Sequence, residues 1–190
     1  MKFNQLIGKL AVKIPQNLRG PMLVHLKTLK ELIEGELEAA RKSPHIDAKL
    51  AVARKIITTS TAACTTVGVE PIPLADFPIL TTVQVLMVAS IMRVSGRDIT
   101  RKGVAEFLSA LGMNIGAGLV FREGARAVIK VLPGFGSAIS GAIAGGATYG
   151  LGRAASSYFI EETPLPEVKR LFRIPSPWKK LKPPAGPREP

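Results

Sequence analysis

Four long stretches of the chain contain no charged residue, and short charged segments separate them. They cover residues 56–69, 77–92, 107–121 and 131–152. Each stretch is long enough for several helical turns, and proline or glycine lies at the breaks between them. We therefore expect an all-α fold of helical hairpins, with Gly-rich, close-packed apolar helices that associate with a membrane.

The residues before these stretches alternate at the helical period. Residues 3–14 place apolar side chains on one face and lysines mostly off it, which predicts an amphipathic helix that packs on the domain or lies on a membrane surface. A second helix is expected from Pro21 to Lys42, with acidic residues opposite its apolar face. Ser43 and Pro44 then predict the cap and first turn of a third helix, from about Ile46 to Val67.

Prolines and glycines predict where the apolar helices stop. Pro71 and Pro73 forbid a continuous helix, and Asp76 is placed to cap the next one. Gly96 is the expected stop of that helix, and Pro133-Gly134 marks a later turn. The pattern divides the chain into N-terminal amphipathic and basic helices (1–44), an apolar helical domain (45–162) and a Pro-rich basic tail (163–190), which we expect to be extended and disordered. Trp178 and its neighbouring lysines could contact lipid headgroups, or the tail could simply be solvated.

Small residues recur four apart in the last uncharged stretch. Of the 18 glycines, 13 lie between residues 96 and 152. Ser137, Gly141 and Gly145 form one ridge of a helix, and an adjacent ridge contains Ala142, Gly146 and Gly150. Such ridges let helix backbones approach closely, in membranes and in tight soluble pairs alike. A homo-oligomer is one assembly to consider, but the sequence itself specifies no oligomeric state.

The charge of the chain favours an anionic membrane over nucleic acid. There are 26 basic and 14 acidic residues, a net charge of +12, and residues 1–55 alone contain 11 basic and 5 acidic side chains. Aromatic residues make up only 5% and do not alternate with the basic ones, so platforms for base stacking are lacking. Basic flanks around an uncharged centre suit lipid headgroups. One Cys and two His do not supply a disulfide or a structural zinc site.

No motif in the chain points clearly to catalysis. No Gly-Lys pair is followed by Ser or Thr, which excludes a phosphate-binding loop of that type, and residues 150–155 match a dinucleotide pattern only loosely. Cys64, with its apolar and Thr neighbours, is expected in the core, and His25 and His45 are expected to be structural. Glu70 and Asp76 could in principle act as an acid–base pair. We predict no enzyme activity, no catalytic residue, no cofactor and no metal.

Gln84 lies two turns beyond Asp76 on the same helical face, among Leu, Val and Met residues. A polar amide in such surroundings is expected to bond across to another helix.

Two segments of the apolar domain resemble a known family. Residues 69–76 (VEPIPLAD), followed by Leu80, Gln84 and Met87, and then residues 132–139 (LPGFGSAI) and 147–154 (ATYGLGRA), followed by Tyr158-Phe159, resemble the bacterial domain of unknown function that follows Era-type GTPase domains in YcjF-like inner-membrane proteins. The likeness covers about residues 50–160. It implies a helical, membrane-associated module without established enzymatic activity that accompanies a GTPase. No GTPase domain is present in this chain, so such a partner would be a separate polypeptide.

These observations lead to two hypotheses. In the first, apolar helices enter or span an inner or cytoplasmic membrane, the basic flanks lie on the cytoplasmic side, and the protein serves as a membrane module or scaffold for a GTPase. In the second, the same stretches form the core of a soluble helical adaptor that binds a GTPase or another acidic protein. The positions to which we assign a structural or interaction role are Pro71, Pro73, Asp76, Gln84, Pro133, Gly134, Gly136, Gly141, Gly145, Gly150 and Arg153.

Overall fold

A computed structural model describes residues 16–69, 76–111 and 136–171 of the chain. The regular elements in these ranges are all helices, which confirms the all-α expectation there. They are α2 (Gln16–Glu34), α3 (Glu36–Lys42), α4 (Ile46–Val69), α5 (Asp76–Val94), α6 (Arg101–Ala110), α8 (Gly136–Phe159) and α9 (Leu165–Leu171).

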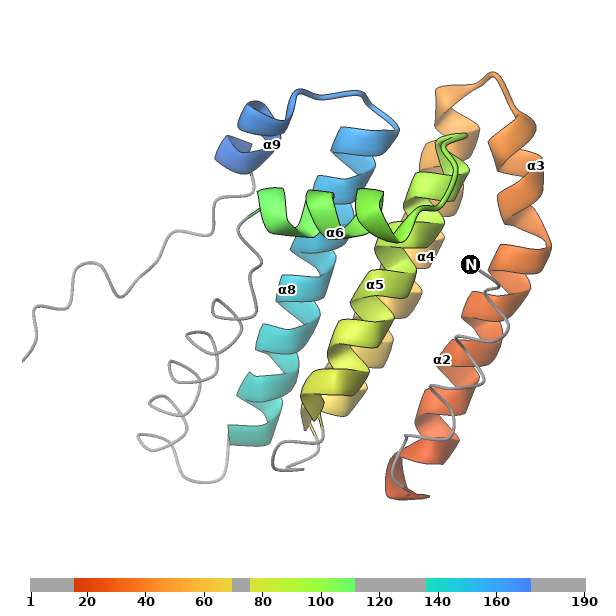
Figure 1. The fold of residues 1–190 in the computed structure, drawn as a ribbon. Coiled ribbons are helices and arrows are strands. Elements are labelled where there is room, and N and C mark those ends of the chain that lie inside the picture. Colours follow the sequence, from red (N-terminus) through yellow and green to blue (C-terminus); the bar gives the residue numbers. More distant parts are fainter. Residues whose placement is uncertain (1–15, 70–75, 112–135, 172–190) are drawn as a thin grey trace, which may run out of the picture.

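The long helices lie side by side along one direction (Figure 1). α4 runs opposite to α2 and α5, and α8 runs in the same direction as α5. α4 contacts all three of these helices, and its most extensive contact is with α8. α6 crosses the bundle near the end where α5 finishes, and α9 packs near the end of α8 (Figure 1).

The segment that precedes α4 in the chain and packs against it consists of two helices. A single helix was expected from Pro21 to Lys42, but the structure ends α2 at Glu34 and begins α3 at Glu36. Gly35 separates them, and its N–H donates to the carbonyl oxygen of Glu31 at 2.9 Å. After this break, Leu37 of α3 is fully buried against the other helices. We call α2 and α3 together, residues 16–42, the arm, and α4, α5, α6, α8 and α9 the body.

The boundaries of α4 and α5 agree with the sequence patterns. α4 begins at Ile46 as expected and ends two residues later than predicted, at Val69. The Ser43 hydroxyl oxygen accepts the His45 N–H at 3.2 Å, but both residues precede α4 and Ser43 ends α3 as its C-cap. The expected placement of Ser43 as the cap and of Pro44 in the first turn of this helix was therefore wrong. After α5, Gly96 has a φ of +102°, a conformation that side chains with a Cβ rarely adopt. The glycine stop is therefore confirmed.

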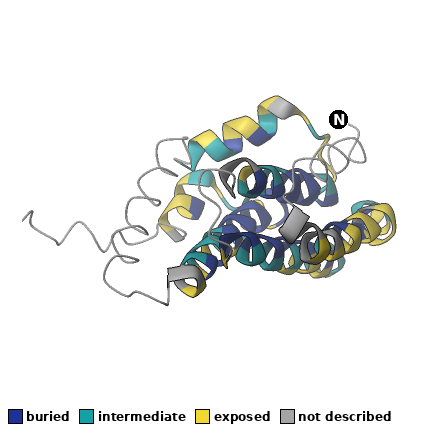
Figure 2. Ribbon diagram, turned by 90° about the horizontal axis from the view of Figure 1, so that it is seen from below, coloured by how far each residue is buried: buried dark blue, intermediate teal, exposed yellow. Residues whose placement is uncertain are grey.

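The core lies where α4, α5 and α8 meet. Figure 2 shows buried residues concentrated in the middle of the bundle and exposed residues on the helices around it, including the arm at the right. The largest side chains with almost no exposed surface come from α2, α3, α4 and α5. They are Leu29, Leu37, Ile56, Ile57, Val67, Val83, Leu86, Met87, Val88 and Ile91.

α6 is fixed to α8 by aromatic contacts. The Phe107 ring stacks on Tyr158 with ring centroids 5.3 Å apart and lies 4.9 Å from the ring of Phe159. The Arg97 guanidinium lies over both α8 rings, at 5.7 and 5.5 Å from their centroids. At the start of α6, the Thr100 hydroxyl oxygen accepts the Gly103 N–H at 3.0 Å.

The start of the Pro-rich tail differs from the expectation. An extended chain was predicted from residue 163, but residues 165–171 form α9, and Val168 in it is fully buried. Pro166 lies in the first turn of this helix, where a missing N–H is tolerated. The apolar side chain of Val168 therefore extends the packed domain beyond residue 162.

The first hypothesis allowed the apolar helices either to enter or to span a membrane. Within the described ranges, none of the helices combines the length and the hydropathy that crossing a bilayer requires. The two longest helices, α4 and α8, each have 24 residues. The reason lies in composition, because α4 has charged residues in its first part and several Thr and Ser after them, and α8 is rich in Gly, Ala and Ser.

Candidate functional site

One predicted glycine ridge forms the contact between α8 and α4. A Cβ atom placed on Gly141 would lie 2.5 Å from Cγ2 of Val69 and 3.0 Å from the carbonyl oxygen of Thr65. On the opposite helix, a Cβ on Gly68 would lie 2.8 Å from Cβ of Ala144. Gly145 likewise faces Thr65. The two backbones therefore approach more closely than any larger residue would allow.

The adjacent ridge faces away from the body. Ala142 and Gly146 are exposed, and a Cβ on Gly146 or Gly150 would meet nothing within 4 Å. Tyr149 lies beside them with 49% of its surface exposed. Both predicted ridges lie on α8. One of them packs against α4, and the other lies on the outward side of the helix. Arg153, one turn further on, is half-buried.

Polar side chains meet inside the apolar body, as expected for Gln84. Its Nε2 donates to Oγ1 of Thr148 on α8 at 3.0 Å, and the Thr148 hydroxyl donates to the carbonyl oxygen of Ala144 at 2.8 Å. The prediction that this amide bonds across to another helix is confirmed. The contact joins α5 to α8 at a level where both are otherwise apolar.

Cys64 of α4 is buried near the same polar contact. Burial raises the pKa of its thiol from 9.0 to about 11, because the thiolate would lose its hydration, and the Thr148 hydroxyl acts in the opposite direction. The thiol is therefore protonated at neutral pH, which agrees with the expected core role and leaves it a poor nucleophile.

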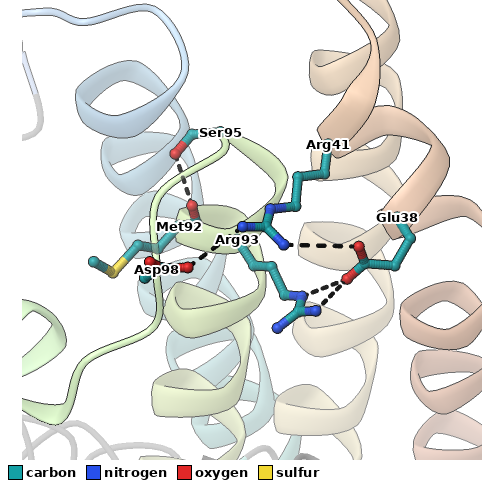
Figure 3. Close-up of polar contacts among 6 residues, drawn as sticks. All are labelled: Glu38, Arg41, Met92, Arg93, Ser95 and Asp98. Carbon is teal, nitrogen blue, oxygen red and sulfur yellow. Dashed lines mark hydrogen bonds and ion pairs between the residues drawn. The ribbon is translucent and has the colours of Figure 1, made fainter.

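A cluster of charged side chains lies at the other end of the bundle (Figure 3). The Glu38 carboxylate of α3 accepts from Nε of Arg93 on α5 at 2.6 Å, and Oε1 also pairs with the second guanidinium nitrogen of that arginine. Arg41 lies 3.8 Å from the same carboxylate and 3.3 Å from Asp98, which follows α5. Beside this cluster, Nζ of Lys55 on α4 is 2.6 Å from Glu36 of α3.

These ion pairs were not predicted. Glu38 and Arg93 are 55 residues apart in the chain, so no local spacing relates them. Acidic residues on the arm and basic residues at the helix ends of the body were visible in the sequence. Their pairing follows only once the arm is placed on α4 and α5.

Several residues singled out in the sequence lie outside the described parts or have no described side chain. Pro71, Pro73, Pro133 and Gly134 lie outside the described residues, as does Glu70. Asp76 and Gly136 are the first residues of α5 and α8. Of the others, Gln84 contacts α8, Gly141 and Gly145 face α4, and Gly150 faces away.

The histidines have local roles. Nε2 of His25 on α2 lies 3.5 Å from the Thr66 hydroxyl of α4, and His45 belongs to the turn before α4. In the ranges 16–69, 76–111 and 136–171 no cluster of three or more His, Cys, Asp or Glu side chains is arranged to hold a metal ion.

Charge is distributed unequally along the body. Residues 56–69 of α4, 77–92 of α5 and 136–152 of α8 contain no charged residue. They lie at matching levels, because Gly152 faces Ile57 and Met87 at one end of this zone and Gly68 faces Gly141 at the other. We call these three segments the uncharged half of the body. The charged cluster of Figure 3 lies beyond its upper limit.

Comparisons with known proteins give no match: no family model, no curated protein and no solved structure matches the chain significantly.

Proposed function

We propose that this protein is a non-enzymatic helical module that associates with an anionic membrane surface and serves there as a scaffold for a partner protein. The observation that carries the proposal is the segregation of charge along the body. The described segments 56–69 of α4, 77–92 of α5 and 136–152 of α8 have no charged residue, and the ion pairs that join the arm to the rest of the protein lie at the other end. Such polarity suits a boundary between hydrocarbon and headgroups.

The dimensions support partial entry into a bilayer. The segments 56–69, 77–92 and 136–152 are each about 20–24 Å long along a helix. The hydrocarbon core of a bilayer is about 30 Å thick, and one leaflet accounts for about half of it. The uncharged half is therefore longer than one leaflet and shorter than the full core, so it suits partial entry without a spanning helix.

The exposed surface of α8 is suitable for such an environment. Ala138, Ala142, Gly146 and Tyr149 are exposed and uncharged. Tyrosine is favoured at the boundary between apolar and polar regions. The net charge of +12 adds attraction to anionic lipid, at about 1 kcal/mol for each Lys or Arg near the headgroups. The resemblance to GTPase-associated domains makes a separate GTPase the partner class that we propose for the scaffold.

Flotation of the full chain with lipid vesicles tests the membrane association. We expect the chain to float with phosphatidylglycerol–phosphatidylcholine vesicles and much less with phosphatidylcholine alone. Ala142→Glu, which places a charge on the uncharged half, should weaken flotation. Ala105→Glu is the matched control, because Ala105 is an exposed alanine of α6 outside that half.

Two results would contradict the proposal. One is a chain that remains in the buffer fraction with both kinds of vesicle, which would favour the adaptor that binds a GTPase or another acidic protein without a membrane. The other is an equal loss of flotation for Ala142→Glu and Ala105→Glu, which would show that net charge alone determines binding.

A further inference from the structure

The arm, as it is docked, lies against the uncharged half that we assign to the membrane. Leu26 of α2 belongs to the same buried cluster as Ala63 and Val67 of α4 and Val83 of α5. The next residue, Lys27, pairs with Glu31 on the outward side of α2, where both are well exposed. The docked arm therefore brings charged side chains to the level of the uncharged half. It also covers apolar side chains of α4 and α5, whereas the exposed part of α8 in the uncharged half is mainly Gly and Ala.

The contact between α3 and the body combines the buried side chains of Leu37 and Ala40 with ion pairs, two of which involve carboxylates of α3. Leu37 is fully buried, and the residues on either side of it, Glu36 and Glu38, pair with Lys55 of α4 and Arg93 of α5. These two cations belong to the body, and both acids belong to the arm. Between 37% and 55% of each of the four side chains is exposed, so the pairs are accessible to competing anions.

We propose that Lys55 and Arg93 form a binding site for the phosphates of anionic lipid, and that Glu36 and Glu38 occupy this site in the closed protein. Lipid phosphate offers the same charge and hydrogen-bond acceptors as the two carboxylates and so competes with them. Displacement of α3 releases the arm around the short link at residues 43–45, and the apolar surface under α2 becomes available to acyl chains. This inference rests on the membrane association proposed above and adds a way in which the arm regulates that association.

A cysteine introduced at residue 63 reports whether α2 is in place. Ala63 is buried, and it lies three residues before Thr66, whose hydroxyl faces His25 of α2, so both are on the side of α4 that the arm covers. The probe is Ala63→Cys in a Cys64→Ala background, and the measurement is its rate of reaction with a soluble thiol reagent. Native Cys64 is buried next to Thr148 of α8 and provides the control for unfolding of the body.

The first comparison is made without lipid. Glu36→Gln with Glu38→Gln removes the ion pairs with Lys55 and Arg93 and leaves the third arm pair, Arg41–Asp98, in place. Glu31→Gln with Glu34→Gln makes the same charge change but affects only pairs within α2, Lys27–Glu31 and Lys30–Glu34. We expect the first pair of substitutions to accelerate labelling at residue 63 by about 5- to 30-fold over the second, with Cys64 still protected. Equal labelling of the two variants would overturn the proposed site.

The second comparison adds lipid. Phosphatidylglycerol vesicles should accelerate labelling at residue 63 of the otherwise unchanged chain, whereas phosphatidylcholine vesicles and inorganic phosphate alone should not. If the chain floats with phosphatidylglycerol vesicles while residue 63 stays protected, the arm does not open and this inference fails, although membrane association stands. If neither the parent chain nor the Glu36→Gln, Glu38→Gln variant floats, the membrane association fails, and the lipid site fails with it.

Discussion

The contact of α8 with α4 and the contact of the arm with the body use different chemistry. Between α4 and α8 the glycines at positions 68, 141 and 145 bring the two backbones together, and the residues that face these glycines are uncharged. The arm is held by leucines and by ion pairs that remain partly exposed. An exposed ion pair contributes about 0–1 kcal/mol, whereas a backbone contact without space for a methyl group tolerates almost no change. The two contacts therefore differ in what would weaken them: added volume between α4 and α8, and loss of charge or of buried leucines at the arm.

The largest effect is expected at the apolar anchor of the arm. Leu37→Ala removes a side chain with no exposed surface, and we expect it to lower the free energy of unfolding by about 2–5 kcal/mol in urea titrations. Val24→Ala is the control, because 62% of Val24 is exposed, and its effect should stay within about 0.5 kcal/mol. Equal effects of the two substitutions would show that α3 is not docked as described.

Alkaline pH tests the interior of the body. The thiol of Cys64 has a pKa of about 11 in the folded chain, compared with 9.0 for a thiol exposed to water. The folded state therefore retains the proton more strongly. Its contribution to stability is complete below pH 9 and is lost as the pH rises from 9 to 11, because the unfolded state binds fewer protons there. The loss should reach about 3 kcal/mol.

The control for this pH effect is Cys64→Ala. Other groups titrate in the same pH range, so the informative quantity is the difference in unfolding free energy between the parent chain and this variant. That difference should shrink from pH 9 to 11. A difference independent of pH would place Cys64 in a hydrated environment and contradict the buried position.

The two ridges of α8 provide a matched pair of substitutions. Gly141→Ala puts a methyl group against α4, whereas Gly146→Ala puts one into open space. Both gain the same helix propensity, so their difference isolates the contact. We expect Gly141→Ala to be less stable than Gly146→Ala by about 1–3 kcal/mol in urea unfolding. Equal stabilities would mean that α4 and α8 can separate without cost.

The smallest effect is expected at the polar contact between α5 and α8. Substituting Gln84→Met and Thr148→Val singly and together gives a double-mutant cycle for the bond between Nε2 and Oγ1. The coupling should be about 0.5–1.5 kcal/mol, the usual net value of such a bond. A coupling near zero would show that the amide bonds to water instead.

The sequence predicted most of the local structure because local signals determine it. The stop at Gly96 follows from a residue type with a known turn conformation, and α4 and α5 follow from uncharged stretches between such signals. Gln84 was predicted to bond across helices because an amide among apolar residues needs a partner.

The remaining features depend on contacts between distant segments. The two ridges of α8 have nearly the same composition, so periodicity does not show which one packs on α4. The break at Gly35 lies within a pattern that continues as helix on both sides, and the proline content obscured α9. The pairing of Glu38 with Arg93 depends on the position of the arm, which no local pattern specifies.

Depth-dependent quenching tests the central claim, that the uncharged half of the body contacts hydrocarbon, most directly. A fluorescent probe is attached at Ala142→Cys or Ala105→Cys in the Cys64→Ala background, and each chain is bound to phosphatidylglycerol vesicles that contain lipids with quenchers on their acyl chains. We predict strong quenching at residue 142 and little at residue 105. Equal and weak quenching at both positions would contradict the account, because acyl chains would then not reach the uncharged half.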